Sequence, residues 1–178
     1  IPSPFTIWRS FKKLAHSHCI EFDLLNWNCK VKKYYDLKAI ALNNQQSNIE
    51  QIRFLIADAV KKRLISDVEV GVFLSGGIDS SAVTYLANDF QPAIRTFSIG
   101  FKPEEHSELP FSKIVANDIG TNHITKTVDN ADFKLLRQLS GVYDEPLADS
   151  SCIPTFLLCE MVSKHIKVAL SGDGGDEV

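Results

Sequence analysis

Two glycine-rich segments combine small residues, hydroxyls and carboxylates at spacings that could bind a nucleotide. The first, Ser-Gly-Gly-Ile-Asp-Ser-Ser at residues 75–81, lies between two apolar runs. Gly76 and Gly77 would let the backbone approach a phosphate without a Cβ in the way. Amides of such a loop, and of a helix that follows it, attract anions, and Ser75, Ser80 and Ser81 would add hydroxyl donors. A phosphate site is therefore one interpretation of the segment.

Asp79 is unusual in a phosphate site, because a carboxylate repels the ligand unless a divalent cation bridges the two. The segment is neither a Walker A loop nor a GxGxxG fingerprint. A plain strand-to-helix turn explains Asp79 equally well, since a carboxylate is favoured at a helix start. Taken alone, residues 75–81 leave both interpretations open.

A second segment, Ser-Gly-Asp-Gly-Gly-Asp-Glu at residues 171–177, repeats the pattern of the first. By itself it is typical of a flexible acidic loop. Each segment directly follows an apolar run with the pattern of a buried strand. The pair therefore favours a site for a nucleotide and a metal, with Asp79 and Asp176 as the metal ligands.

Strand and helix patterns alternate from residue 68 onward. Buried-strand patterns and helical patterns follow one another at residues 68–75, 80–89, 93–101, 109–120, 122–128, 131–140, 151–165 and 166–171. Gly120 is expected to end one helix, and Asn130 is expected to cap the next. This order predicts an α/β fold with a doubly wound parallel sheet. Ligands of such sheets bind beyond the carboxyl ends of the strands, where both glycine segments would lie.

The N-terminal part has a different character. Residues 1–38 are aromatic and basic and predict two or three strands with loops. The polar run at residues 43–48 is typical of a linker, and apolar residues at helical spacing predict an amphipathic helix over residues 48–64. We therefore divide the chain into residues 1–42 and 43–178.

Composition narrows the class of protein. The 178 residues are 44% hydrophobic and 23% charged, which is typical of a soluble globular protein. A net charge of −3 argues against nucleic acid or an anionic membrane as a partner. No apolar run reaches the length of a membrane span, and the first ten residues lack the pattern of a signal peptide. Four cysteines without a CxxC motif indicate a reduced chain and a cytoplasmic location.

Five segments also carry a resemblance to a known family. They read VGVFLSGGIDSS, TFSIGF, ELPFSKIVANDIGTNH, DEPLADSSCIPTFLL and IKVALSGDGGDEV, in the family's order and spacing. Together they resemble the ATP-pyrophosphatase loop family, and within it the glutamine-dependent asparagine synthetases. The implied fold is that of the adenine nucleotide alpha-hydrolases. Residues 1–42 resemble the β-rich end of the family's Ntn-type glutaminase domain, and residues 43–178 the first part of its ATP-binding domain.

The resemblance implies formation of asparagine from aspartate through an aspartyl-adenylate, with release of AMP and pyrophosphate. Ammonia derived from glutamine would be the nitrogen donor, and ATP and Mg²⁺ would be required. Asp173 stands where well-known members carry a glutamate that acts in the amide-forming step, and is the implied catalytic residue. Mg²⁺ would be held by Asp79 and Asp176. The implied ATP-binding residues are Phe73, Ser75, Gly76, Gly77, Asp79, Ser80, Ile99, Ser171 and Gly172.

Two other functions stay open. A related amidotransferase could act on another carboxylate, such as a sugar acid of a surface polysaccharide or the precursor of a β-lactam or cyclic peptide. A nucleotide-binding module without turnover is the second alternative. The resemblance allows a homodimer. The family's N-terminal cysteine and its later pyrophosphate-binding lysine have no counterpart in these residues, so the chain is expected to be a fragment that is inactive alone.

Several further residues receive ordinary structural interpretations. His16, His18 and Cys19 form a turn rather than a zinc site, since a fourth ligand is missing. In the segment DEPLADSS, Asp149 or Ser150 caps the next helix, or the segment lies near the acceptor substrate. Three histidines stand alone and are expected at the surface or in packing: His106, His123 and His165. A core stripe is expected from three residues at helical spacing, Phe156, Leu157 and Met161. A solvated helix face is expected from three basic residues, Lys61, Lys62 and Arg63.

Overall fold

The computed structural model describes residues 1–43, 48–102, 107–129, 133–143, 145 and 149–175. Three residues named above, His106, Asn130 and Asp176, lie outside these ranges. The chain forms two compact units, Ile1–Asn48 with Ser140–Ala148 and Ile49–Leu139 with Asp149–Val178. Among the described helices, none has both the length and the apolar character that crossing a bilayer requires.

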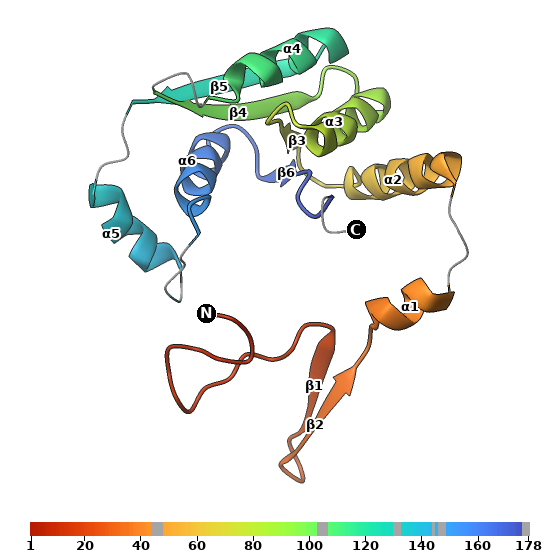
Figure 1. Ribbon diagram of the computed structural model, residues 1–178, viewed down its shortest axis with the longest axis vertical. Coiled ribbons are helices and arrows are strands. Elements are labelled where there is room, and N and C mark those ends of the chain that lie inside the picture. The colour runs from red at the N-terminus through yellow and green to blue at the C-terminus, as the bar shows by residue number, and fades with distance from the viewer. Residues whose placement is uncertain (44–47, 103–106, 130–132, 144, 146–148, 176–178) are drawn as a thin grey trace. The chain divides into compact units, whose positions relative to one another are not determined.

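A parallel four-stranded sheet organises the second unit (Figure 1). Its strands are β3 (Val70–Phe73), β4 (Arg95–Phe101), β5 (Asn122–Val128) and β6 (Val168–Leu170). Their order across the sheet is β5-β4-β3-β6, and every neighbouring pair is parallel. β3, β4 and β5 lie side by side in chain order, and β6 pairs with the other edge of β3. Parallel neighbours need crossover connections, which helices provide here. The predicted parallel sheet and its four strands are confirmed.

Helices cover both faces of this sheet, which makes it doubly wound as predicted (Figure 1). One face carries α2 (Ile49–Arg63), α3 (Ile78–Phe90) and α4 (Leu109–Ile119), and the other carries α6 (Cys152–Val162). The helix α5 (Phe133–Val142) follows β5 in the chain. Side chains alternate across the sheet, as the two-residue period of strands requires. Val72 thus packs with Val60 and Ala87 on the first face, and Phe97 packs with Met161 and Val162 on the second.

Local sequence signals explain where these helices end and which sides they bury. Gly120 ends α4 with φ of 78°, and its N–H donates to the Ala116 carbonyl at 3.0 Å. A left-handed conformation of this kind favours glycine, and the predicted helix end is confirmed. On α6, Leu157 and Met161 are buried as the core stripe predicts.

The surface of α2 differs from the expectation. Of the apolar residues at helical spacing only Val60 is buried, while Ile49, Ile52 and Ile56 are 71%, 44% and 40% exposed. Among the described elements, α2 makes its main contacts with α3. One neighbouring helix covers one stripe of α2. Part of the remaining apolar surface, Phe54, Ile56 and Ala57, lines a groove between α2, α3 and α4.

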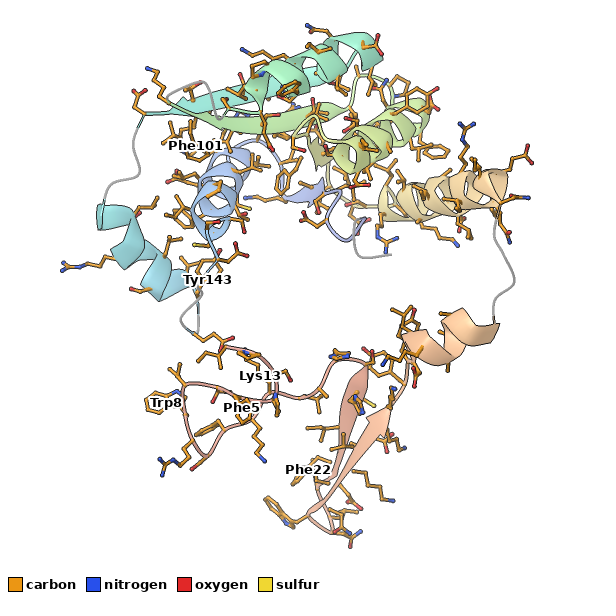
Figure 2. The ribbon with its side chains drawn as sticks, viewed as in Figure 1. Phe5, Trp8, Lys13, Phe22, Phe101 and Tyr143 are labelled. Carbon is orange, nitrogen blue, oxygen red and sulfur yellow. The ribbon has the colours of Figure 1, made fainter. Side chains whose placement is uncertain are left out.

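The first unit contains an antiparallel hairpin of β1 (His18–Asp23) and β2 (Asn28–Lys33), followed by α1 (Leu37–Asn43). Large aromatic residues of this unit are exposed, among them Phe5, Trp8 and Phe22 (Figure 2). The sequence interpretation did not include α1, although Asp36 was a usable signal: its carboxylate accepts the Lys38 amide at 3.1 Å. The proposed boundary at residues 42 and 43 falls inside α1 and stays a prediction, as does the origin of residues 1–42.

Candidate functional site

The first glycine segment connects β3 to α3 and needs glycine at its second position. Gly76 has φ of 90°, which residues with a Cβ rarely adopt. A Cβ added there would also lie 2.6 Å from the Ser112 backbone nitrogen, at the start of α4. The loop therefore passes close under α4, and Gly76 permits that approach.

Hydrogen bonds within the loop hold it in shape. The Gly77 N–H donates to Ser75 Oγ at 3.3 Å, and Ser80 Oγ donates to the Gly77 carbonyl at 3.2 Å. The two hydroxyls lie 2.9 Å apart. Because the single Ser80 hydroxyl hydrogen points to Gly77, Ser75 is the donor between them. Ser75 and Ser80 therefore link the two ends of the loop.

The start of α3 presents free amides at this loop. The first backbone bond of the helix runs from the Ser81 N–H to the Gly77 carbonyl at 3.0 Å. The amides of Ile78, Asp79 and Ser80 come before it and have no acceptor within the helix. Amides in this position, at the positive end of the helix dipole, bind phosphate groups. The helix begins two residues earlier than predicted, so that Asp79 belongs to its first turn.

The second glycine segment follows β6 and packs against the first. A Cβ added at Gly172 would lie 2.6 Å from the Ser80 backbone nitrogen. A Cβ added at Gly175 would lie 2.5 Å from Cγ of the Asp79 carboxyl group. Ser171 donates from its hydroxyl to Asp173 Oδ2 at 3.0 Å. The two segments, 90 or more residues apart in the chain, thus meet at the carboxyl ends of adjacent parallel strands.

A cleft of about 790 Å³ lies where the two loops meet. It contains every described residue of the predicted site except Gly76, which lies beside it under α4. Eight residues outside the two glycine segments, which the sequence interpretation did not assign to a nucleotide site, also line it: Leu74, Phe97, Ser98, Glu108, Ser151, Pro154, Thr155 and Leu158. Four of these come from α6 and the residue before it, and the segment DEPLADSS was the signal that could have found them.

Asp79 is suited to hold a divalent cation in this cleft. Its carboxylate is half-buried against Gly175 and lines the cleft beside the free amides of α3. Within the described ranges, no group of three His, Cys, Asp or Glu side chains converges on one point. Mg²⁺ takes one or two protein carboxylates and completes its shell with phosphate oxygens and water. The residues therefore fit Mg²⁺ bound together with a nucleotide.

The segment before α6 behaves as a helix start. The Ser151 N–H donates to Asp149 Oδ1 at 2.8 Å, and this bond lowers the pKa of the Asp149 carboxyl group. This bond closes the turn before the helix, so the expectation that Asp149 or Ser150 caps α6 is wrong: Ser151 occupies the N-cap position and makes no side-chain cap bond. His16 lies in the predicted turn, but His18 and Cys19 belong to β1 instead; the ring of His18 bonds to the His16 carbonyl at 2.8 Å. Lys61, Lys62 and Arg63 are exposed as expected.

His123 has a packing role, one of the two roles expected for it. Its ring lies between β4 and β5 and bonds to the hydroxyls of Thr96 and Ser98. Burial lowers the pKa of His123, and the charge of Lys113 lowers it further. The sequence interpretation missed this contact because Thr96 and His123 are 27 residues apart and meet only through strand pairing.

The model of the asparagine synthase family matches residues 51–178 of the chain. The chain belongs to this family. It is 41% identical over 186 residues to a putative asparagine synthetase 2 (glutamine-hydrolyzing) of Methanocaldococcus jannaschii, covering 100% of this chain and 35% of that protein. It is 39% identical over 181 residues to asparagine synthetase 1 (glutamine-hydrolyzing) of Bacillus subtilis, covering 100% of this chain and 28% of that protein. The chain thus spans about a third of the length of these curated relatives.

Solved structures outside the asparagine synthase family share the fold. The NH3-dependent NAD synthetase of Campylobacter jejuni matches with a TM-score of 0.52 and 15% identity, covering 74% of this chain and 59% of that one. The glutamine-dependent NAD+ synthetase of Acinetobacter baumannii, solved with ADP, matches with a TM-score of 0.53 and 17% identity, covering 89% of this chain and 30% of that one. The predicted α/β fold with a doubly wound parallel sheet is confirmed, and these NAD synthetases share it.

Proposed function

We propose that the full-length protein forms asparagine from aspartate, ATP and ammonia derived from glutamine, with AMP and pyrophosphate as products. One observation carries this proposal: the two glycine loops pack against each other at the edge of one cleft. A single phosphate-binding loop would be compatible with many enzymes. Two such loops, with Asp79 between them and family membership over residues 51–178, favour adenylation of a carboxylate.

In this proposal the loop after β3 binds the β- and γ-phosphates, which depart as pyrophosphate. The amides of Ile78, Asp79 and Ser80 would donate to phosphate oxygens as negative charge develops on them. Because the hydroxyls of Ser75 and Ser80 already hold the loop, these donors need little rearrangement when ATP binds. Mg²⁺, held by Asp79 and by Asp176 in this proposal, would neutralise charge on the same phosphates.

The rest of the nucleotide would extend over the ends of the strands. Phe73 and Ile99 line the cleft where β3 and β4 end, and would contact the adenine. Ser171 and Gly172 line it at the end of β6, and would contact the α-phosphate and ribose. The closeness of Gly172 to Ser80 means that a nucleotide bound there would touch both loops together.

Asp173 is proposed to act in the second half-reaction. Its carboxylate lines the cleft and accepts the Ser171 hydroxyl, so Ser171 orients it. A carboxylate in this position would accept a proton from the attacking ammonia. We also propose that the full-length protein binds small-molecule substrates rather than nucleic acid or a membrane, is located in the cytoplasm and forms a homodimer. Residues 1–178 would be inactive without the rest of the full-length protein.

Aspartate-dependent exchange of labelled pyrophosphate into ATP tests the adenylation step. The full-length protein should catalyse this exchange with Mg²⁺ present. Asp79→Asn should reduce exchange by about 10²-fold or more, because the phosphate charge loses its bridging cation. Asp58→Asn is the matched control: Asp58 pairs with Lys62 on the exposed surface of α2 and does not line the cleft.

The outcomes separate the alternatives. Exchange that depends on aspartate supports asparagine formation. If exchange requires a different carboxylate, the protein is a related amidotransferase. If ATP binds and no carboxylate supports exchange, the protein is a nucleotide-binding module. Equal exchange in Asp79→Asn and wild type would refute the assignment of the cation to Asp79.

A further inference from the structure

A buried polar network links the edge strand β5 to the first glycine loop. His123 Nδ1 lies 2.9 Å from Thr96 Oγ1, and His123 Nε2 lies 3.4 Å from Ser98 Oγ. Thr96 Oγ1 lies 2.8 Å from Thr121 Oγ1. Thr96 and Ser98 are 0% and 5% exposed, so these groups exchange few hydrogen bonds with water. The network lies on the face of the sheet that carries α3 and α4, where Lys113 of α4 contributes to the electrostatics of His123.

The proton positions in this network follow from the number of hydrogens available. Ser98 donates its only hydroxyl hydrogen to the Leu74 carbonyl. Toward His123 it can only accept, so Nε2 of the ring must carry a hydrogen. In the neutral ring, which burial and Lys113 favour, Nδ1 then accepts from Thr96. This assignment requires the Thr121 hydroxyl to donate to Thr96 rather than to the Ala116 carbonyl, which lies 3.5 Å away. The chain of donors therefore runs from Thr96 through His123 and Ser98 to Leu74.

Leu74 is where this chain meets the nucleotide site. It is the residue between β3 and Ser75, and it is 1% exposed. Its N–H donates to the Phe97 carbonyl at 2.9 Å. Its carbonyl, on the other side of the residue, accepts the Ser98 hydroxyl. Both backbone groups of Leu74 are thus fixed to β4, and the direction in which the chain enters Ser75 and Gly76 is fixed with them.

We propose that His123 is a positioning residue for the phosphate-binding loop. By donating from Nε2 it keeps the Ser98 hydroxyl directed at the Leu74 carbonyl, and Leu74 in turn sets the position of Ser75 and the glycines after it. The inference rests on the proposed binding of ATP in the cleft. It extends the site to a residue on β5 that does not line the cleft.

Two amide substitutions separate this role from simple packing. In His123→Gln the side-chain amide can place a donor near the position of Nε2, so Ser98 stays directed at Leu74. In His123→Asn the amide reaches only as far as Nδ1, so Ser98 loses its donor. Both variants remove the ring, and a packing role predicts similar defects in the two. Thr125→Val is the control, because Thr125 lies on the same face of β5 opposite Ser98 and is exposed.

Binding of ATP with Mg²⁺ to the full-length protein, measured by calorimetry, is the first test. We expect His123→Asn and Ser98→Ala each to weaken binding about tenfold, the effect of losing one hydrogen bond. His123→Gln should stay within about threefold of wild type. The double variant Ser98→Ala with His123→Asn should be no weaker than Ser98→Ala alone, because both changes break the same chain. Equal weakening by Gln and Asn, or additive effects in the double variant, would overturn the proposal.

A second measurement does not depend on ATP. In full-length protein with ¹⁵N-labelled histidine, the shifts of the two ring nitrogens show which one carries the hydrogen. His123 should carry it on Nε2 at neutral pH, and a hydrogen on Nδ1 alone would refute the chain of donors. If wild-type protein fails to bind ATP while the hydrogen is on Nε2, the proposed function fails and the network stands.

Discussion

Gly172→Ala should disable the nucleotide site without removing any functional group. The new Cβ would lie 2.6 Å from the Ser80 backbone nitrogen and 2.9 Å from the Asp79 carbonyl carbon. Ordinary contacts of a Cβ begin near 3.4 Å, so one loop has to move by about 0.8 Å. Both neighbours are backbone atoms of the first turn of α3, so a change of side-chain rotamer cannot relieve the clash.

The size of the effect follows from this displacement. A misplacement of about 1 Å between catalytic groups and a reacting centre costs on the order of 10²-fold in rate. Overpacking of this kind also costs about 1–3 kcal/mol of stability. We therefore expect Gly172→Ala to lower kcat/KM for aspartate-dependent exchange about 10²-fold, in a protein that remains folded and has a reduced Tm.

The assay compares the variant with a substitution of the same chemistry elsewhere. Gly141→Ala serves as the control, because a Cβ at Gly141 in α5 has no neighbour within 4 Å. Exchange kinetics and thermal unfolding are measured for wild type and both variants, at a temperature well below the lowest Tm. Gly141→Ala should keep wild-type exchange and gain up to about 1 kcal/mol of stability, since alanine is the better helix former.

Wild-type exchange in Gly172→Ala would refute the reasoning, because it would mean that the contact between the loops positions nothing that adenylation needs. Loss of exchange together with loss of the folded state would leave catalysis unmeasured in that variant. Gly172→Ser is then the second measurement: it adds a Cβ at the same place, and a folded Gly172→Ser with wild-type exchange refutes the reasoning equally.

The remaining predictions concern catalysis, loop strain and pH. In the full-length protein, Asp173→Asn should lower asparagine formation by about 10²–10⁴-fold, the range for general acid–base catalysis, and spare pyrophosphate exchange; equal loss of both would move Asp173 to the adenylation step. Gly76→Ala should cost about 2–5 kcal/mol in urea unfolding, because it combines unfavourable φ with a clash against the Ser112 backbone; a smaller cost would mean that α4 shifts freely. The folded-state pKa of His123 lies below the ordinary value of 6.5, through burial and then Lys113. The unfolded chain therefore binds this proton first as pH falls, and stability should decrease from about pH 6.5 down to the folded-state pKa. His123→Gln should flatten that part of a plot of Tm against pH, and an unchanged slope would exclude His123 as its source.

Much of the fold could be predicted because its signals are local. The run Val70 to Leu74 is apolar enough to be buried on both sides, as central parallel strands are. Gly120 marks a helix end by its own conformational preference. The helix α1 was missed although Asp36 marks its start. The exposed face of α2 depends on which neighbours cover it, and that cannot be inferred from periodicity.

The candidate site could be predicted in part for the same reason. Ser75, Asp79 and Gly172 belong to short segments whose composition indicates their chemistry, and the rule that parallel strands end at one edge brought the segments together. Glu108 lies in a segment without such composition, and it lines the cleft because it precedes the helix α4, which packs on the sheet.

By itself, the sequence determined which residues could bind phosphate and a cation, and the order of strands and helices that carries them. Those properties reside in side-chain chemistry and in periods of two and 3.6 residues, both of which are visible along the chain. Only the tertiary structure decided that Gly172 would abut Ser80, that Gly175 would face the Asp79 carboxylate and that His123 would reach Leu74 through Ser98. Each of these contacts joins segments that strand pairing brings together. Such pairing is set by the packing of the whole sheet and its helices, which no single segment encodes.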